Sequence, residues 1–361
     1  MKKKLKEICN IEKGKQIDTK SLDDSNSYRY INGGIKESGF YNDFNTSGEA
    51  VLISEGGASC GYVNYVNERF WCGCHCYRLT DINAYPKFLF YSLKASQNGI
   101  MELRTGAAMP NIKKESLKNF EVSIIEDKEE QIKIAAHLDT IQSAIDNKKQ
   151  QLSLLDEAVK SEFVEMFGDN QTLEFQTLEN ICSIITDGTH QPPKFTTTGI
   201  PFLFVSNIAG NKITYETEKF ISEKTYEELY KRTPIEIGDV LLSTVGSYGH
   251  PAIVETDNKF LFQRHIAYLK PKKDLINSIY FHGALLSPDA QKQIEERVKG
   301  IAQKTLNLSE IRKIKIPVPP LELQNQFATF VQQIDKSKSL VKQQIADLQE
   351  LLDSRMQEYF A

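Results

Sequence analysis

The sequence predicts an α+β protein in which two similar strand-rich domains are separated by an antiparallel coiled coil of two long helices, with pseudo-twofold symmetry. Two observations carry this prediction. Residues 131–167 align without a gap onto residues 324–360, at a constant offset of 193 residues. Each stretch has the apolar periodicity of a long helix and follows a strand-patterned segment of comparable length. A duplicated domain–helix unit presents two similar surfaces, which suits a two-part target.

The chain is expected to divide into four segments. These are a first domain, a first helix, a second domain and a second helix, at residues 1–125, 126–169, 170–318 and 319–361. In the first domain, residues 49–54 and 70–79 have strand patterns, and Gly/Asn turns punctuate the chain at 32–34 and 56–57.

A short helix is predicted at residues 85–97, because Pro86 suits a first helical turn. The first long helix begins near Asp127, where residues 127–130 form a plausible capping box, and it ends at Gly168.

The second domain repeats short motifs of the first. Residues 178–182 repeat 5–9, residues 238–243 resemble 48–54 with one residue of slip, and residues 300–308 resemble 106–112 with two residues inserted. Outside these motifs the domains diverge, so they are expected to share a fold but not a ligand. The proline-rich residues 317–320 end the last strand and precede the second long helix.

The two long helices share one apolar seam with alternating spacings of three and four residues. The apolar seam positions are Ile134, Leu138, Ile141, Ile145, Leu152, Leu155, Val331, Ile334, Val341, Ile345, Leu348 and Leu352. One lysine interrupts each seam, Lys148 and Lys338, and single polar seam residues fix register. A paired rod of roughly 55 Å would match roughly 15 base pairs of duplex. The alternative is that each helix packs only on its own domain.

Charge is unevenly distributed over the 361 residues. The net charge of −4 argues against a nucleic-acid binder, but residues 128–169 and 321–361 carry −4 and −2, which leaves the domains at +2. The domains, rather than the helices, are therefore the parts suited to DNA. Six cysteines, no apolar run of about 18 residues and no signal-like segment predict a cytoplasmic protein with free thiols and no membrane span.

Several motifs, in this order and duplicated, resemble one known family. They are residues 163–169 (FVEMFGD), 187–193 (DGTHQPP), 199–202 (GIPF), 238–243 (GDVLLS) and 317–324 (PVPPLELQ). The chain resembles, over essentially its whole length, the specificity subunit of type I DNA restriction–modification systems. One departure is that residues 122–127 (VSIIED), rather than a Pro-Pro pair, precede the first helix.

The resemblance implies two target-recognition domains, each of which contacts one half of an asymmetric, interrupted double-stranded DNA sequence. The helices would dock two adenine-methyltransferase subunits, and motor/nuclease subunits would be further partners. It implies no catalysis and no cofactor in this chain, because S-adenosylmethionine, Mg²⁺ and ATP belong to the partner subunits.

Gly-rich and small polar loops let the backbone approach bases and phosphates closely, and Asn, Arg and Asp side chains can recognise base edges. The resulting DNA-binding candidates are Asn32, Gly33, Gly34, Lys36, Ser54, Glu55, Gly57, Ser59, Arg104, Lys113, Thr186, Asp187, Thr189, His190, Ser206, Asn207, Thr244, Ser247, Tyr248, Lys299 and Lys304. Ordinary turn chemistry and a solvated surface are the alternatives for each of them.

Cys72, Cys74 and Cys76, with His75, invite a zinc interpretation. We expect instead one strand that places the three thiols in a sheet core, and no metal site. The Gly-rich phosphate loops and the Gly-x-Ser-x-Gly elbow are missing, which argues against an enzyme such as a stand-alone methyltransferase–nuclease. A coiled-coil scaffold with two protein- or glycan-binding domains is the other alternative.

Overall fold

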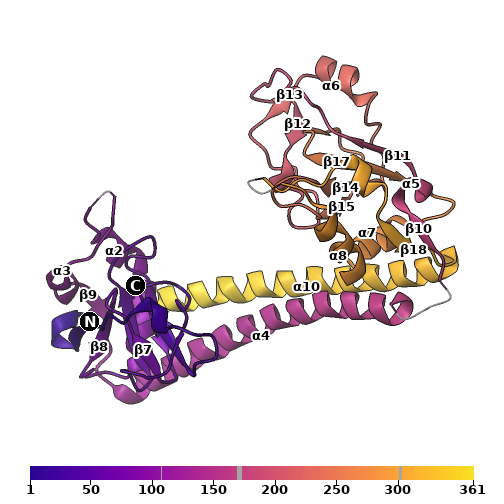
Figure 1. Cartoon of the computed structure of the whole chain (residues 1–361). Coiled ribbons are helices and arrows are strands. Elements are labelled where there is room, and N and C mark those ends of the chain that lie inside the picture. The colour runs from indigo at the N-terminus through magenta and orange to yellow at the C-terminus, as the bar shows by residue number, and fades with distance from the viewer. Residues whose placement is uncertain (107, 169–172, 301–302) are drawn as a thin grey trace. The chain divides into compact units, whose positions relative to one another are not determined.

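The computed structural model describes residues 1–106, 108–168, 173–300 and 303–361. It divides into two compact units, unit 1 (Met1–Gln150 with Lys342–Ala361) and unit 2 (Gln151–Val341). Each unit holds one strand-rich domain and part of both long helices (Figure 1). The predicted boundary at 169/170, and residues 107, 301 and 302 of the repeated loop motif, lie outside the described residues.

Unit 1 begins with a mixed domain built around a four-stranded antiparallel sheet of order β2-β8-β5-β6. Its strands are β1 (Lys2–Lys4), β2 (Asn10–Lys13), β3 (Tyr28–Ile31), β4 (Phe40–Tyr41), β5 (Ala50–Ser54), β6 (Val63–Val66), β7 (Phe70–Cys72), β8 (Cys76–Thr80) and β9 (Glu121–Ser123). Its short helices are η1 (Leu5–Glu7), η2 (Thr19–Ser21), α1 (Pro86–Ala95), α2 (Gln97–Glu102) and α3 (Lys114–Lys118).

Unit 2 contains a domain with the matching four-stranded sheet, of order β11-β17-β14-β15. Its strands are β10 (Phe175–Thr177), β11 (Cys182–Asp187), β12 (Ile200–Leu203), β13 (Phe220–Ile221), β14 (Val240–Ser243), β15 (Pro251–Ile253), β16 (Leu261–Phe262), β17 (Ile266–Pro271) and β18 (Lys315–Pro317). Its helices are α5 (Leu178–Ile181), η3 (Val205–Asn207), α6 (Glu223–Tyr230), α7 (Ser278–Leu286), α8 (Pro288–Arg297) and α9 (Leu308–Ile311).

The strands of the two domains share one topology within the described residues. The sheets β4-β3-β7 and β13-β12-β16 correspond, and in each the pairing of the middle strand with the last strand is parallel. The terminal pair β1-β9 likewise corresponds to β10-β18. The predicted duplication therefore includes every described strand of the two domains.

Helices α4 (Lys128–Phe167) and α10 (Leu321–Phe360) pack together in both units. In unit 1 the start of α4 meets the end of α10, because the Nδ1 atom of His137 lies 2.9 Å from the hydroxyl of Tyr359. In unit 2 the order is reversed, since the ring centroids of Phe163 and Phe327 lie 5.4 Å apart and Asp156 pairs with Lys338 at 2.7 Å. The helices run antiparallel, and the predicted fold class is confirmed.

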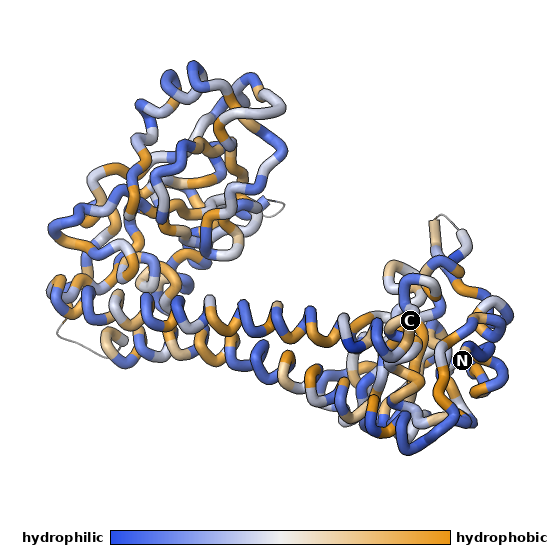
Figure 2. The backbone as a smooth tube through the Cα atoms, turned by 180° about the vertical axis from the view of Figure 1, so that it is seen from behind, coloured by the Kyte–Doolittle hydropathy of each residue, from blue (hydrophilic) through white to orange (hydrophobic). Residues whose placement is uncertain are grey.

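The seam explains why such polar helices stay paired. Among the predicted seam residues, Ile134, Leu138, Ile141, Ile145, Val341 and Leu352 are buried, and Leu152, Leu155, Val331, Ile334, Ile345 and Leu348 are half-buried. Apolar positions recur along both helices between polar ones (Figure 2). Lys338 in the seam is half-buried and keeps its charge compensated by Asp156.

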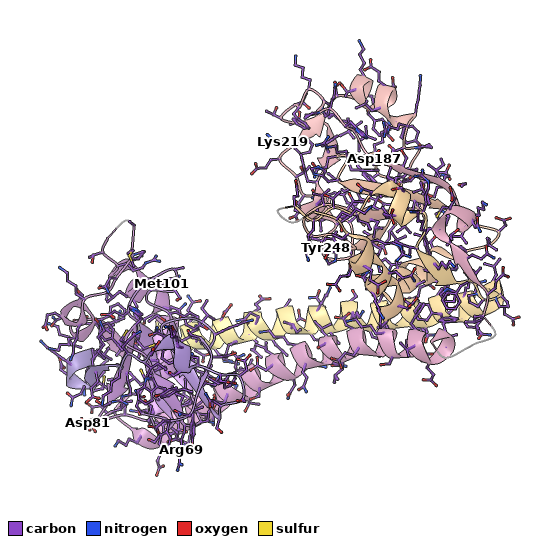
Figure 3. The ribbon with its side chains drawn as sticks, viewed as in Figure 1. Arg69, Asp81, Met101, Asp187, Lys219 and Tyr248 are labelled. Carbon is purple, nitrogen blue, oxygen red and sulfur yellow. The ribbon has the colours of Figure 1, made fainter. Side chains whose placement is uncertain are left out.

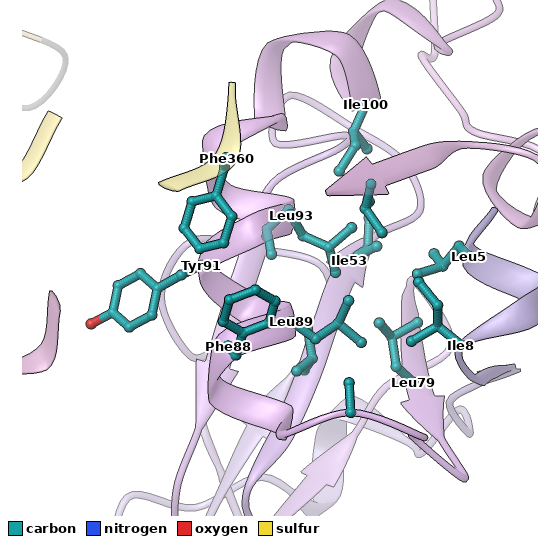
Figure 4. Close-up of a cluster of buried hydrophobic side chains, with 14 of the residues drawn as sticks. Leu5, Ile8, Ile53, Leu79, Phe88, Leu89, Tyr91, Leu93, Ile100 and Phe360 are labelled. Atoms are coloured by element: carbon teal, nitrogen blue, oxygen red, sulfur yellow. The ribbon is translucent and has the colours of Figure 1, made fainter. Parts of the chain in front are cut away.

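Each domain is also joined to the helices by an aromatic side chain in its core. In unit 1, Phe360 at the end of α10 packs against Phe88 of α1, with ring centroids 5.2 Å apart (Figure 4). In unit 2, Phe327 of α10 contacts Phe163 and Phe167 of α4 and Tyr280 of α7. The helices therefore pack both on each other and on the domains.

A buried glutamine at the start of each helix repeats the same hydrogen bonds. In unit 1 the Gln131 side chain accepts from the Tyr85 N–H at 2.6 Å and donates to the Ile125 carbonyl. In unit 2 the Gln324 side chain accepts from the Asn277 N–H at 2.8 Å and donates to the carbonyls of Leu275 and Pro319. Gln131 and Gln324, the first pair of the aligned segments, therefore hydrogen-bond each long helix to its domain.

Replacing Gln324 with alanine is expected to destabilise unit 2 by about 2–4 kcal/mol, because buried backbone groups would lose their partners. Hydrogen exchange measured by mass spectrometry on peptides of unit 2 would report the loss. Gln333→Ala is the matched control, because Gln333 is an exposed glutamine on the same helix within unit 2, and this change should alter stability by under about 0.5 kcal/mol. Equal effects of the two variants would contradict the assignment.

The cysteine-rich segment differs from the prediction. It forms two strands, β7 and β8, joined by a turn at residues 73–75, because Gly73 N–H bonds the Ile31 carbonyl and Cys76 N–H returns to Gly73. Cys72 and Cys76 are buried in the sheet core as expected, but Cys74 lies in the turn with its thiol 2.6 Å from the Gln16 amide oxygen. Within the described residues, no helix is long and apolar enough to cross a membrane.

Candidate nucleic-acid interface

In unit 1, three loops meet at one end of the four-stranded sheet, and residues 55–57 among them belong to a predicted loop. The Glu55 N–H, just after β5, donates to the carbonyl of His75 in the β7–β8 turn at 2.8 Å. The Ile112 N–H donates to the Glu55 carbonyl at 2.9 Å, and the Gly57 N–H donates to the Pro110 carbonyl at 3.0 Å. These backbone bonds hold residues 55–57, 73–75 and 110–112 side by side.

Unit 2 builds the same end with equivalent bonds. The Thr244 N–H donates to the His265 carbonyl at 3.0 Å, and the Leu306 N–H donates to the Thr244 carbonyl at 2.8 Å. The Gly246 N–H, which corresponds to that of Gly57, donates to the Lys304 carbonyl at 3.2 Å. Loops far apart in the sequence therefore form one surface in each domain.

Gly57 and Gly246 occupy the tip of this surface. Both have positive φ, +77° and +73°, and a Cβ atom added at either position would have no neighbouring atom within 4 Å. The left-handed backbone favours glycine, and the open space around it lets another molecule approach the main chain. Contact of these loops with a nucleic-acid backbone or a base edge stays a prediction.

The first strand of the four-stranded sheet ends in a cation in unit 1 and in an anion in unit 2. Lys13 ends β2, and its ammonium lies 2.6 Å from the carboxylate of Glu55. Asp187 ends the equivalent strand β11 (Figure 3) and pairs with Arg232 and, at 2.9 Å, with His190. The backbone is the same in both domains, because Gly14 N–H bonds the Cys76 carbonyl and Gly188 N–H bonds the Ile266 carbonyl. One position therefore carries a cation in one domain and an anion in the other.

The carboxylate of Glu55 is held in place from two directions. Besides Lys13, it accepts a hydrogen bond from the Tyr77 hydroxyl at 3.2 Å. Burial and the nearby Glu55 charge raise the pKa of Tyr77 to about 12, so the phenol stays protonated and keeps donating. The first domain thus presents a fixed acid–base pair at its sheet end.

Unit 2 has a cavity of about 500 Å³ at its sheet end. Its polar lining residues include Asp187, Thr244, Arg264, His265, Gln303 and Thr305. Burial, followed by the charge of Arg264, lowers the pKa of His265, so its imidazole is neutral at neutral pH. A second hollow of about 440 Å³ is lined by residues that include Thr189, His190, Lys194 and Arg232. Asp187 connects the two, because it lines the first and its carboxylate pairs with residues of the second.

Arg264, His265 and Gln303 are cavity residues that the sequence did not single out. The sequence does contain a pattern that indicates Arg264, because residues 72–76 (CGCHC) align with residues 262–266 (FQRHI) around the shared histidine. The domain duplication, applied residue by residue, would have placed Arg264 at the position of Cys74 at the sheet end.

The predicted DNA-binding residues fall into groups by exposure. Exposed ones are Lys36, Gly57, Arg104, Lys113, His190, Ser206, Ser247, Lys299 and Lys304. Half-buried ones are Asn32, Gly34, Ser59, Thr186, Asp187, Thr189 and Tyr248. Buried ones are Gly33, Ser54, Glu55, Asn207 and Thr244, of which Thr244 lines the unit 2 cavity.

The side chains of several predicted contact residues form hydrogen bonds within their own domain. The Ser54 hydroxyl donates to the Gly33 carbonyl at 2.7 Å, and the Ser59 hydroxyl shares that acceptor. The Asn207 amide accepts from the Phe204 N–H and donates to the carbonyls of residues 214 and 216. As a correction to the expectation of base contact, the buried side chains of Ser54 and Asn207 shape the loops.

Comparison with known proteins decides the family. Residues 1–157 and 170–350 match the family model described as the type I restriction modification DNA specificity domain. The chain belongs to the type I specificity subunits. It is 24% identical over 370 residues to a protein described as a type I specificity subunit in Mycoplasma genitalium, covering 99% of this chain and 93% of the relative. It is 28% identical over 158 residues to the EcoBI specificity subunit of Escherichia coli, covering 44% of this chain and 33% of the relative.

Solved structures share the fold of this specificity subunit. The S subunit of a type I restriction–modification system from M. genitalium matches with a TM-score of 0.62 and 22% identity, covering 100% of this chain and 96% of that one. A chain from a structure titled for complex assembly and conformational transition of the type I R-M system matches with a TM-score of 0.59 and 15% identity, covering 99% and 97%. A specificity subunit has a non-catalytic role within its complex, as the sequence predicted.

Proposed function

We propose that this specificity subunit recognises a bipartite, asymmetric double-stranded DNA target, with one half-site for each domain. The observation that carries the proposal is the reversal of charge at one structural position, which is Lys13 in unit 1 and Asp187 in unit 2. Lysine donates to acceptors such as those of guanine, whereas a carboxylate accepts from the amino group of cytosine. Equivalent loops with opposite chemistry favour different bases, and hence two different half-sites.

The exposed cations at the sheet ends would position the phosphate backbone. Arg104 and Lys113 flank the loop of unit 1, and Lys299 and Lys304 flank the equivalent loop of unit 2. Phosphate contacts supply affinity and orientation, whereas the loops between them would supply base recognition. The other predicted loop residues are proposed to contact DNA on the same surface.

The paired helices are proposed to dock two adenine-methyltransferase subunits, with motor/nuclease subunits as further partners. S-adenosylmethionine, Mg²⁺ and ATP would be bound by those partners. The helix acids that the sequence suggests for docking are Glu129, Glu130, Asp139, Asp146, Asp156 and Asp335, of which Glu129, Glu130, Asp146 and Asp156 are exposed. Asp139 is instead engaged within the chain, because it pairs with Lys87 at 2.9 Å and accepts from the Tyr91 hydroxyl at 2.6 Å. The docking proposal therefore relies on the exposed acids and not on Asp139.

Genome-wide methylation mapping, in cells with and without this gene, tests the proposed function. The expected result is an adenine-methylated motif with two different half-sites and a constant gap, present only with the gene. A scaffold that binds proteins or glycans would leave the methylation pattern unchanged, which would overturn the proposal.

Removing seven residues from α4 and the seven equivalent residues from α10 is expected to shorten the gap between the half-sites. Seven helical residues span roughly 10 Å, which corresponds to about three base pairs of duplex. A matched pair of deletions preserves the heptad seam, so the helices should still pair. Methylation mapping should then give unchanged half-site bases with an altered gap. Changed bases with the original gap would contradict the spacer role.

A further inference from the structure

Among the arginines of unit 2, Arg264 has the guanidinium with the weakest contacts to other protein groups. Arg232 is paired with Asp187, Arg312 donates to the Ile185 carbonyl at 2.6 Å, and Arg297 donates to the Gln293 carbonyl at 2.9 Å. Arg264 is exposed, and within the described residues its side-chain hydrogen bond is from Nε to the His265 ring at 3.4 Å. Its two terminal nitrogens are therefore available to a ligand.

The turn that carries Arg264 is held by its backbone on several sides. The Arg264 N–H donates to the Thr189 carbonyl at 3.1 Å, and the neighbouring Gln263 N–H donates to the Leu203 carbonyl at 3.1 Å. The Ile266 N–H closes the turn onto the Gln263 carbonyl at 3.1 Å. A fixed turn presents the guanidinium with little loss of backbone freedom on binding, which favours specific recognition.

Arg264 and Asp187 line the same cavity of about 500 Å³, but the Asp187 carboxylate pairs with Arg232 and His190 instead. The cavity therefore presents a fork of N–H donors and a carboxylate acceptor as separate groups. In the major groove, a G·C pair displays the O6 and N7 acceptors of guanine beside the amino donor of cytosine. The guanine acceptors complement the Arg264 guanidinium, and the cytosine amino donor complements the Asp187 carboxylate.

We propose that Arg264 is the guanine-recognising residue of the second domain, with Asp187 facing the cytosine of the same base pair. The inference rests on the proposed function and extends it to one base pair of one half-site. In the first domain the equivalent residue is Cys74, whose thiol contacts Gln16. A thiol cannot form the bidentate bond, so the first half-site has no such contact at the equivalent position.

The test uses the whole complex, with this subunit expressed alongside its methyltransferase partner, and maps methylation at the genome scale. Arg264→Ala should make one G·C position degenerate in one half-site, with discrimination reduced by roughly 5- to 100-fold. The other half-site and the gap should stay unchanged. Arg297→Ala is the matched control, since it removes the same charge from α8 of the same unit, away from the cavity lining.

Arg264→Lys separates base recognition from phosphate contact. Lysine keeps the charge but lacks the planar fork, so a guanine contact should still be relaxed, whereas a phosphate contact should be preserved. Wild-type discrimination in Arg264→Lys, or a uniform loss of methylation at all sites in Arg264→Ala, would overturn the inference. Relaxed specificity at an A·T position in Arg264→Ala, or unchanged specificity in that variant, would also overturn the inference.

A modified base gives a second, independent readout. In an oligonucleotide substrate, 7-deazaguanine at the relaxed position removes N7, and it should slow methylation by the wild-type complex but not by the Arg264→Ala complex. Equal slowing of both complexes would show that Arg264 does not contact that base. If the wild-type complex yields no bipartite motif, the proposed function itself fails. A bipartite motif that is insensitive to Arg264 would refute only this inference.

Discussion

A chain in which residues 2–127 replace residues 175–320 is expected to direct methylation to two identical half-sites in inverted orientation. The exchange is defined by the structure, because β1 corresponds to β10, and Gln131 and Gln324 make the same bonds to their domains. The new domain would thus be fastened to α10 by the bonds that fasten the first domain to α4. The recognition chemistry of Asp187 and Arg264 would be replaced by that of Lys13, Glu55 and Cys74.

Methylation mapping with the partner subunits present would show whether the motif has become palindromic with the original gap. Circular dichroism of the purified chimera would establish that it folds. A folded chimera that retains two different half-sites would contradict the assignment of each half-site to one domain. The wild-type chain, mapped in parallel, supplies the reference motif.

Replacing Phe327 with alanine is expected to destabilise unit 2 by about 3–5 kcal/mol, because a fully buried ring would leave a cavity. The ring lies 5.4 Å from that of Phe163, 5.7 Å from that of Phe167 and 6.4 Å from that of Tyr280. It therefore joins α4, α10 and α7 at one point, and the edge-to-face geometry adds to the burial energy.

Thermal unfolding and hydrogen exchange of unit 2 peptides would measure the effect. The control is Leu340→Ala, because Leu340 lies on the same helix but is 67% exposed, and this change should shift stability by under about 0.5 kcal/mol. Comparable destabilisation by both variants would show that the aromatic cluster does not hold the junction. DNA specificity should be unaltered wherever the Phe327 variant stays folded.

The helices and the duplication can be predicted because both are local patterns in the sequence. Heptad spacing is visible within one helix, and the offset of 193 residues needs no knowledge of contacts. Turn glycines such as Gly57 and Gly246 are likewise predictable at loops, because positive φ restricts residue choice. The family likeness adds the function that these patterns alone do not specify.

The rest depends on contacts between distant residues. Asp187 belongs to a loop motif that suggests a free surface carboxylate, but its pairing with Arg232, 45 residues away, is invisible in the sequence. Asn207 has a base-recognising side chain, yet its amide turns inward to the backbone, and composition cannot distinguish the two orientations. The cysteine segment resembles one strand because the alternation continues through the short turn between β7 and β8, which lie in different sheets.

If Lys13 and Asp187 contact different bases, as proposed, they also determine how the subunit is oriented on a chromosome. A symmetric protein binds its site equally well when rotated by half a turn, and so it cannot distinguish upstream from downstream. A protein whose ends accept different bases binds in a single orientation. Each occupied site would then acquire a polarity, and every partner attached to the subunit would face a defined direction along the genome.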